Sequence, residues 1–167
     1  MKKSAVIILW EQSTDSIILT QRSDSLRDHP GEICFPGGRW DPGDADLWST
    51  ALRELYEELG IVAGRVQLVK ELLPEKTLAG SIIYPWLATV PNMQPYTLND
   101  DEVAAVFTLP MHEVIQASNY HDVLVTIHGR SINACQFMAS EHFVWGATAR
   151  IMKQLCHTSL LSTKEKY

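Results

Sequence analysis

Glu54, Glu57 and Glu58 stand at positions i, i+3 and i+4 within a stretch whose apolar residues repeat at helical spacing. On an α-helix these positions are neighbours, so the three carboxylates can converge on one point. Like charges at this spacing repel one another, and hard divalent cations such as Mg²⁺, which prefer oxygen ligands, relieve the repulsion. The pattern therefore predicts a metal site, with a solvated acidic face as the alternative.

An arginine and a glycine pair favour the metal site over a merely acidic surface. Arg53 reaches Glu57 at i+4 and is placed to hold one carboxylate in position. Gly37 and Gly38 form a loop without side chains, so a ligand or a metal ion can approach its backbone. We therefore interpret residues 35–61 as a metal-dependent site for phosphates.

The helix that carries the glutamates has a predicted start, a buried face and an end. At about 100° per residue, an apolar stripe forms beside the acidic face from Trp48, Ala51, Leu52, Leu55 and Leu59. Asp44 or Asp46 is suited to cap the N-terminus, and Gly60 supplies a left-handed stop after Leu59. The apolar stripe is therefore expected to face the core, with the acidic face at its border.

Residues 53–61, RELYEELGI, resemble the second half of the Nudix box, REUxEExGU, at every fixed position, where U is an aliphatic residue. That box is the signature of hydrolases that cleave a diphosphate linked to another moiety. The first half departs from the usual pattern, because Asp44 stands where a glutamate is usual and one extra residue separates it from Arg53. This spacing is similar to that of the coenzyme A pyrophosphatases, whose box reads GG, two residues, DP, one residue, D and eight residues before RE.

A second motif resembles the same branch of the family. Residues 18–38, here called the coenzyme A motif, match the signature LLTxR[SA]x3Rx3Gx3FPGG except at Ile18. The resemblance implies that Arg22, Arg27 and Gly38 bind substrate, since a guanidinium fork suits phosphate oxygens. The alternative for both arginines is a surface ion pair. Residues 145–151 also resemble the closing WGxTA segment of that branch.

The resemblance also implies roles for the box residues. Glu57 and Glu58 are the expected metal ligands, and Glu54 is a third ligand or the general base. Arg53 supports the catalytic glutamates, and the backbone carbonyl of Gly37 is expected to complete the coordination. In some Nudix enzymes the base comes from a downstream loop, and three residues are the candidates here, with a solvated turn as their alternative: Asp100, Asp101 and Glu102.

The function implied is hydrolysis of coenzyme A or an acyl derivative to a phosphopantetheine product and adenosine 3′,5′-bisphosphate, with Mg²⁺ or Mn²⁺. Two alternatives stay open. Another Nudix pyrophosphatase acts on a different nucleoside diphosphate derivative, such as NADH or ADP-ribose. A nucleotide-sensing module has lost catalysis, although a sensor does not need Arg53 and all three box glutamates, which are retained here.

Length and charge bound the remaining possibilities. The 167 residues predict one Nudix hydrolase domain over residues 1–167. A net charge of −6 argues against nucleic acid as a partner, and no apolar run is long enough to span a bilayer. Three scattered cysteines indicate free thiols, so we expect a cytoplasmic protein. The resemblance leaves homodimerisation open.

Apolar patterning predicts an α+β domain of short strands and interspersed helices. Strands are expected at residues 4–10, 17–22, 32–35, 66–73, 81–90, 103–109, 121–128 and 131–138. Besides the box helix, helices are expected at residues 111–117 and 144–160. Pro85 within its strand indicates a sheet edge or a bulge. The Nudix resemblance implies a mixed β-sheet sandwiched between α-helices.

Overall fold

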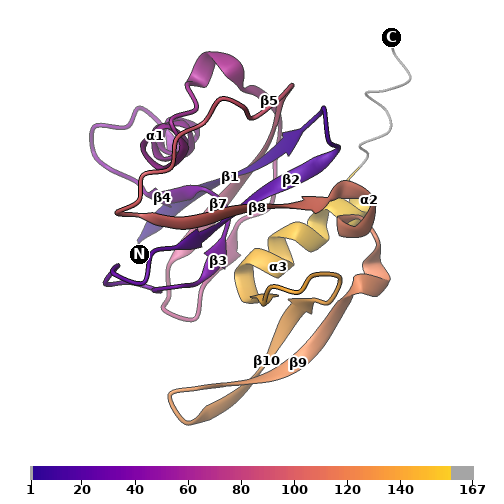
Figure 1. Ribbon diagram of the computed structural model, residues 1–167. Coiled ribbons are helices and arrows are strands. Elements are labelled where there is room, and N and C mark those ends of the chain that lie inside the picture. The colour runs from indigo at the N-terminus through magenta and orange to yellow at the C-terminus, as the bar shows by residue number, and fades with distance from the viewer. Residues whose placement is uncertain (1, 159–167) are drawn as a thin grey trace.

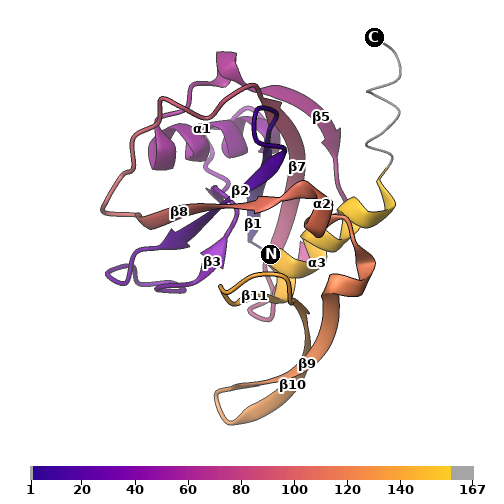
Figure 2. The ribbon, with the colours of Figure 1, turned by 45° about the vertical axis from the view of Figure 1, so that its right-hand side comes forward.

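A mixed eight-stranded sheet forms the centre of the computed structural model, which describes residues 2–158 (Figure 1). Its strands are β1 (Lys3–Glu11), β2 (Ser16–Arg22), β3 (Ile33–Cys34), β4 (Gly37–Arg39), β5 (Gln67–Glu71), β6 (Glu75–Lys76), β7 (Ile82–Val90) and β8 (Val103–Pro110). Strands β1 and β7 run parallel, and every other pair in this sheet is antiparallel. A smaller antiparallel sheet projects from the body and contains β9 (Tyr120–Ile127), β10 (Arg130–Phe137) and β11 (Val144–Trp145) (Figure 2).

Two helices cover the two faces of the large sheet, as the Nudix resemblance implies. Helix α1 (Leu47–Leu59) buries Ala51 and Leu55 in the apolar cluster on one face. Helix α3 (Gly146–Lys153) buries Ile151 and Met152 in the cluster on the other face. The shorter helical segments are α2 (Met111–Val114), η1 (Ala63–Arg65), η2 (Ala117–Asn119) and η3 (Gln154–His157). The mixed sheet between helices is therefore confirmed.

The hairpin strands β1 and β2 separate, and the glycine loop lies in the gap between them. They pair only near their turn, at Trp10 with Ile17 and at Glu11 with Ser16. Further along, β3 pairs with β2 and β4 pairs with β1, so residues 33–39 cross from one strand to the other. Strand β4 was not expected from the sequence. It brings the backbone of the glycine loop against α1.

One of the two alternatives for Pro85, the sheet edge, was wrong, and so was the start of the last helix. Strand β7 lies inside the sheet, between β1 and the pair β5 and β6, so Pro85 does not mark an edge. The neighbouring strand is interrupted opposite this proline and carries one extra residue there, because Glu71 pairs with Trp86 and Glu75 pairs with Ile83. This irregularity agrees with the bulge alternative, and the Leu72 N–H donates to the Pro85 carbonyl at 2.9 Å. The helix expected from residue 144 begins at Gly146, because Val144 and Trp145 pair with β10.

The two later helices are also shorter than expected. Helix α2 ends at Val114, and the chain continues through a separate 3₁₀ turn that begins at Ala117. Helix α3 gives way to η3, and residues 159–160 of the expected helix lie outside the described residues. Within residues 2–158, no helix has the length and apolar character needed to cross a membrane.

Candidate active site

Helix α1 begins and ends where its flanking residues can satisfy the free backbone groups. The side chain of Asp46, at the N-cap, accepts a hydrogen bond from the Ser49 N–H at 2.7 Å. Gly60 follows the helix with φ of 68°, and its N–H donates to the Tyr56 carbonyl at 2.8 Å. Both predicted signals are therefore confirmed. Of the two candidate caps, Asp46 is the one that the structure uses.

Arg53 ties the start of the box to its glutamates. Its Nε and Nη2 donate to the two carboxylate oxygens of Asp44 at 2.8 and 3.0 Å. Its Nη1 donates to Glu54 at 3.0 Å and to both oxygens of Glu57 at 3.2 Å, so the expected contact with Glu57 is present. Nη2 also donates to the Arg39 carbonyl at 3.0 Å. The hydrogen bonds from Arg53 hold the pKa of Asp44 well below its usual range.

Three carboxylates meet between α1 and the start of β8. Glu54, Glu58 and Glu102 each offer one oxygen, and these oxygens lie within 4.8 Å of one another. The Gly37 N–H donates to Oε1 of Glu58 at 3.2 Å, which places the glycine loop beside this group. Gly38 packs so closely on the Glu54 carboxylate that a Cβ atom there would lie 2.5 Å from it. We call Glu54, Glu58 and Glu102 the acidic cluster.

The surroundings of the acidic cluster make its carboxylates difficult to ionise. Burial, and then the charge of Glu57, raise the pKa of Glu54 to about 7. Burial, opposed by the Gly37 N–H and supported by the charges of Glu54 and Glu102, raises the pKa of Glu58 to about 8. Buried carboxylates that repel one another fit a divalent cation, which neutralises them and takes their oxygens as ligands.

We expect the metal-free protein to lose stability as the pH rises through the range in which Glu54 and Glu58 titrate. The folded-state pKa values of both carboxyls lie above 4.5, so their contribution to stability is complete below pH 4.5 and is lost as the pH passes about 8. Thermal unfolding in a chelator at about pH 5 and about pH 9 should show a larger fall in Tm for the wild type than for Glu58→Gln. Mn²⁺ should reverse the difference, whereas equal falls would contradict this cause.

The other acidic candidates lie outside the acidic cluster. The side chain of Glu57 is 43% exposed and forms an ion pair with Arg53. Arg53 also forms an ion pair with Glu54. Its expected role as a metal ligand requires its carboxylate to turn from Arg53 towards the cluster. Asp100 and Asp101 are both exposed and are not among the clustered residues. The downstream loop therefore contributes Glu102 to the cluster, and not its two aspartates.

The two arginines of the coenzyme A motif lie at the end of β2 (Arg22) and on the loop that follows it (Arg27). Nε and Nη2 of Arg22 donate to the backbone carbonyl of Asp28 at 3.1 and 3.0 Å. Arg27 is exposed and has no hydrogen bond or ion pair to any described residue. Neither arginine forms the alternative side-chain ion pair among residues 2–158. His29, on the same loop, pairs with Glu32 at 2.8 Å.

Cys34 lies close to the acidic cluster, which the sequence did not indicate. Its thiol contacts the Thr20 hydroxyl at 3.9 Å, and the residue is half-buried. Burial, and then the charge of Glu58, raise the pKa of the thiol to about 12. The thiol therefore stays protonated near neutral pH and is not an activated nucleophile.

Comparison with known proteins identifies the family. The family model of the NUDIX domain matches residues 1–126. The chain belongs to the Nudix hydrolase family. A protein of Yersinia pestis (strain Pestoides F), named "Uncharacterized Nudix hydrolase NudL", is 40% identical over 157 residues, which cover 92% of this chain and 78% of that protein.

Solved structures of other Nudix proteins share the fold. The Ap4A hydrolase of C. elegans, solved as a binary complex, superposes with a TM-score of 0.57 at 23% identity and covers 67% of this chain and 83% of its own. The NUDIX domain of Shewanella oneidensis NrtR, solved with ADP ribose, gives a TM-score of 0.50 at 23% identity over 68% of this chain and 74% of its own. At these identities the likeness shows the fold and does not separate substrates.

Family membership makes this chain an enzyme, a Nudix hydrolase. Nudix hydrolases generally use divalent metal ions and act on small nucleotide substrates. The acidic cluster between α1 and the start of β8 is a group of residues that can hold such an ion.

Proposed function

We propose that this Nudix enzyme hydrolyses the diphosphate of coenzyme A or its acyl derivatives, giving a phosphopantetheine product and adenosine 3′,5′-bisphosphate. One observation supports this most directly. The N–H of Ser23, which follows Arg22 in the coenzyme A motif, donates to the carbonyl of Glu102 at 3.0 Å. The loop that distinguishes the coenzyme A branch is thus attached to a residue of the acidic cluster, although the two are far apart in the sequence.

The bound cation, for which we propose Mg²⁺ or Mn²⁺, supplies charge neutralisation at the diphosphate and favours ionisation of a water molecule. Glu54 and Glu58 are proposed to hold it, with Glu102 and the Gly37 carbonyl beside them. Glu57 is proposed as a further ligand. Two alternative roles are proposed for Glu54: it is a metal ligand, or its carboxylate stays free of the metal and is the general base that accepts a proton from the attacking water. Arg53 keeps Glu54 oriented through its 3.0 Å hydrogen bond.

The arginines and Gly38 are proposed to bind the substrate. Arg27 is exposed and carries a guanidinium that is free of described partners, so it can take the 3′-phosphate of coenzyme A. Arg22 holds the loop through Asp28, and two N–H groups are enough for that contact, which leaves other N–H groups for phosphate oxygens. Gly38 keeps the loop backbone open to the diphosphate.

Arg27→Ala is expected to weaken activity on coenzyme A more than on dephospho-coenzyme A. Loss of a charged hydrogen bond costs about 1.5–3 kcal/mol, so kcat/KM for coenzyme A should fall about tenfold or more. Steady-state rates with both substrates measure the difference. Arg130→Ala is the matched control, because Arg130 is exposed at the turn between β9 and β10. Equal losses on both substrates would show that Arg27 binds the diphosphate or only supports its loop.

The wild-type enzyme gives a separate test of the substrate. If Nudix catalysis here is directed at coenzyme A, removing its 3′-phosphate should lower kcat/KM. An unchanged rate would favour the alternative, a pyrophosphatase acting on another nucleoside diphosphate derivative. The sensing alternative has less support, because the box arginine and all three box glutamates are retained.

A further inference from the structure

Arg65 makes an unusual set of contacts beyond the C-terminal end of α1. Its guanidinium lies against four successive backbone carbonyls. Nη1 donates to the carbonyl of Pro95 at 2.7 Å. Nη2 lies 2.9, 3.0 and 2.9 Å from the carbonyl oxygens of Asn92, Met93 and Gln94. No carboxylate of residues 2–158 pairs with it, and the hydrogen bonds of its two terminal nitrogens all go to one loop, residues 92–95.

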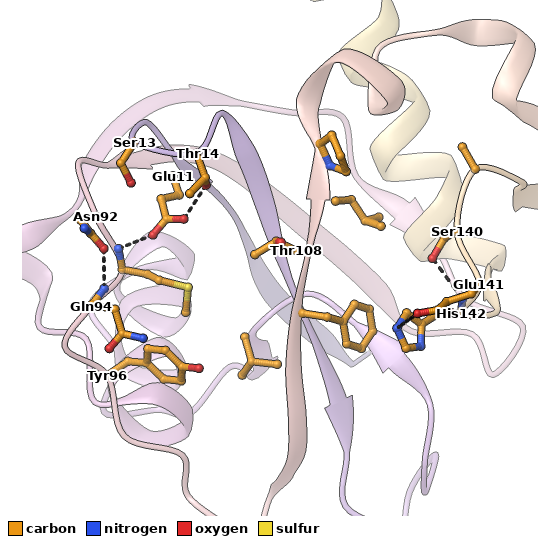
Figure 3. Close-up of a pocket in the computed structure, with 16 residues that line it drawn as sticks. Glu11, Ser13, Thr14, Asn92, Gln94, Tyr96, Thr108, Ser140, Glu141 and His142 are labelled. Carbon is orange, nitrogen blue, oxygen red and sulfur yellow. Dashed lines mark hydrogen bonds and ion pairs between the residues drawn. The ribbon is translucent and has the colours of Figure 1, made fainter.

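The same loop is held from its other side by a buried acid. Glu11, at the end of β1, is only 4% exposed, and its Oε2 accepts the Met93 N–H at 2.7 Å. Its Oε1 accepts the hydroxyl of Thr14 at 2.5 Å. Figure 3 shows Glu11 directed at the segment that carries Asn92 and Gln94. The Arg65 guanidinium therefore donates to the carbonyls of the loop, and the Glu11 carboxylate accepts from one of its N–H groups.

Residues 92–95 belong to the loop that leads from β7 to Glu102. The residues that follow them form hydrogen bonds with the backbone of α1. The Thr97 N–H donates to the Leu59 carbonyl at 2.9 Å. The Asn99 N–H donates to the carbonyl of Glu58, itself a member of the acidic cluster, at 2.9 Å. The Glu102 N–H then donates to the Asn99 carbonyl at 3.0 Å. Figure 2 shows the segment passing alongside α1 before it enters β8.

We propose that Arg65 is a positioning residue for Glu102: by fixing residues 92–95 it sets the path of the loop that delivers the Glu102 carboxylate to the acidic cluster. The proposal rests on the metal site of the proposed function. Arg65 itself lies in η1, shortly after the C-terminal end of α1. Its guanidinium therefore fixes the loop relative to α1, the helix that carries Glu54 and Glu58. The short distances among the three carboxylates of the acidic cluster depend on this placement of the loop.

The chemistry of the side chain explains why an arginine suits this position. A planar guanidinium offers five N–H donors in a fixed arrangement, whereas an ammonium is a compact charge with three donors. Four carbonyls in succession match the wide fork and exceed what one ammonium can hold in place. Arg65→Lys should therefore keep the charge but hold the loop only in part.

The test measures Mn²⁺ binding to the full chain, by electron paramagnetic resonance of free Mn²⁺, together with amide hydrogen exchange of the metal-free protein. The variants are Arg65→Ala, Arg65→Lys, Glu102→Gln and the double variant Arg65→Ala with Glu102→Gln. Arg130→Ala is the matched control for loss of an arginine. Circular dichroism confirms that each variant is folded, and Arg65→Lys provides the comparison if Arg65→Ala does not fold.

We expect Arg65→Ala to weaken Mn²⁺ binding about tenfold, the lower end of what is lost when a residue that orients a metal ligand is removed. Arg65→Lys should give a smaller loss, and hydrogen exchange at residues 97–102 should rise in both. In the Glu102→Gln background, Arg65→Ala should add little, because both changes act through one carboxylate.

Three results would overturn the proposal. Wild-type Mn²⁺ affinity in Arg65→Ala, with a clear loss in Glu102→Gln, would remove the role of Arg65 and leave the metal site intact. Losses that multiply in the double variant would show that Arg65 acts independently of Glu102. Unchanged affinity in Glu102→Gln would remove both this inference and the role of Glu102 in the proposed metal site.

Discussion

Glu58→Gln is expected to lower kcat by more than about 100-fold, which is the upper end of the loss when only a supporting residue of a metal site is removed. Glu58 is 7% exposed and lies at the centre of the interactions around the acidic cluster, between the Gly37 N–H and the carboxylates of Glu54 and Glu102. Glutamine keeps the volume and removes the charge that a divalent cation needs. Steady-state hydrolysis and Mn²⁺ binding, measured on the same preparation, check the prediction.

The fold of this variant should survive, because burial already disfavours the charged form of Glu58. The amide oxygen of glutamine can still accept the Gly37 N–H. Glu71→Gln is the matched control, since Glu71 is an exposed residue of β5 and the change removes the same charge. Wild-type turnover in a folded Glu58→Gln variant would mean that the metal site is elsewhere.

Gly38→Ala is expected to reduce activity by about 10–100-fold with little loss of stability. A Cβ atom at this position would lie 2.5 Å from the carboxyl carbon and from Oε1 of Glu54. Because these atoms are the end of a flexible side chain, the carboxylate moves aside at little cost to the fold. A displacement of about 1 Å at a catalytic group can cost about 100-fold in rate. Paired measurements of kcat and Tm test the expected separation of the two effects.

Gly37→Ala provides the contrast. A Cβ atom there would collide with the Ala5 carbonyl oxygen and lie 2.7 Å from the Cα of Val6, which are backbone atoms of β1. The backbone cannot move aside without separating β4 from β1. The free energy of unfolding of this variant should therefore fall by about 1–3 kcal/mol or more, and its activity should fall as well. If Gly38→Ala were as unstable as Gly37→Ala, or fully active, the proposed packing on Glu54 would be wrong.

The elements that the sequence predicted well are those set by local patterns. The apolar stripe of α1, its cap and Gly60 all act within one or two turns of the helix, so spacing alone was sufficient. The same holds for the hairpin of β9 and β10, whose turn contains Gly129 with φ of 76°. Local chemistry therefore anticipated the helix that carries the site.

The parts that the sequence missed depend on contacts between distant segments. Strand β4 has only three residues, of which two are glycines, and forms because β1 offers free backbone groups where β2 has separated from it. Glu102 was one of three candidates in the downstream loop, and the sequence could not select it over Asp100 and Asp101, because a loop of irregular structure returns to α1 and no periodic pattern describes such a path. The hydrogen bonds between Arg53 and Asp44 span nine residues, from the turn before the N-cap of α1 into the helix itself, beyond the range of helical spacing.

Pro85 shows how tertiary structure can satisfy a local rule in an unexpected way. Proline cannot donate to a neighbouring strand, which argues for an edge position. In this sheet the neighbour stops at Glu71 as β5 and resumes at Glu75 as β6, so the interruption falls beside the proline. A sequence pattern does not show whether the strand that contains the proline or the strand beside it will be interrupted.

Identification of the products tests the central claim most directly. The full chain, incubated with Mg²⁺ or Mn²⁺, would be given coenzyme A, dephospho-coenzyme A, NADH and ADP-ribose, and the products would be analysed by mass spectrometry. The account predicts preferential formation of phosphopantetheine and adenosine 3′,5′-bisphosphate from coenzyme A. Faster cleavage of another member of the panel would contradict the coenzyme A assignment, and no cleavage of any member with either metal would contradict the proposed catalysis on these substrates.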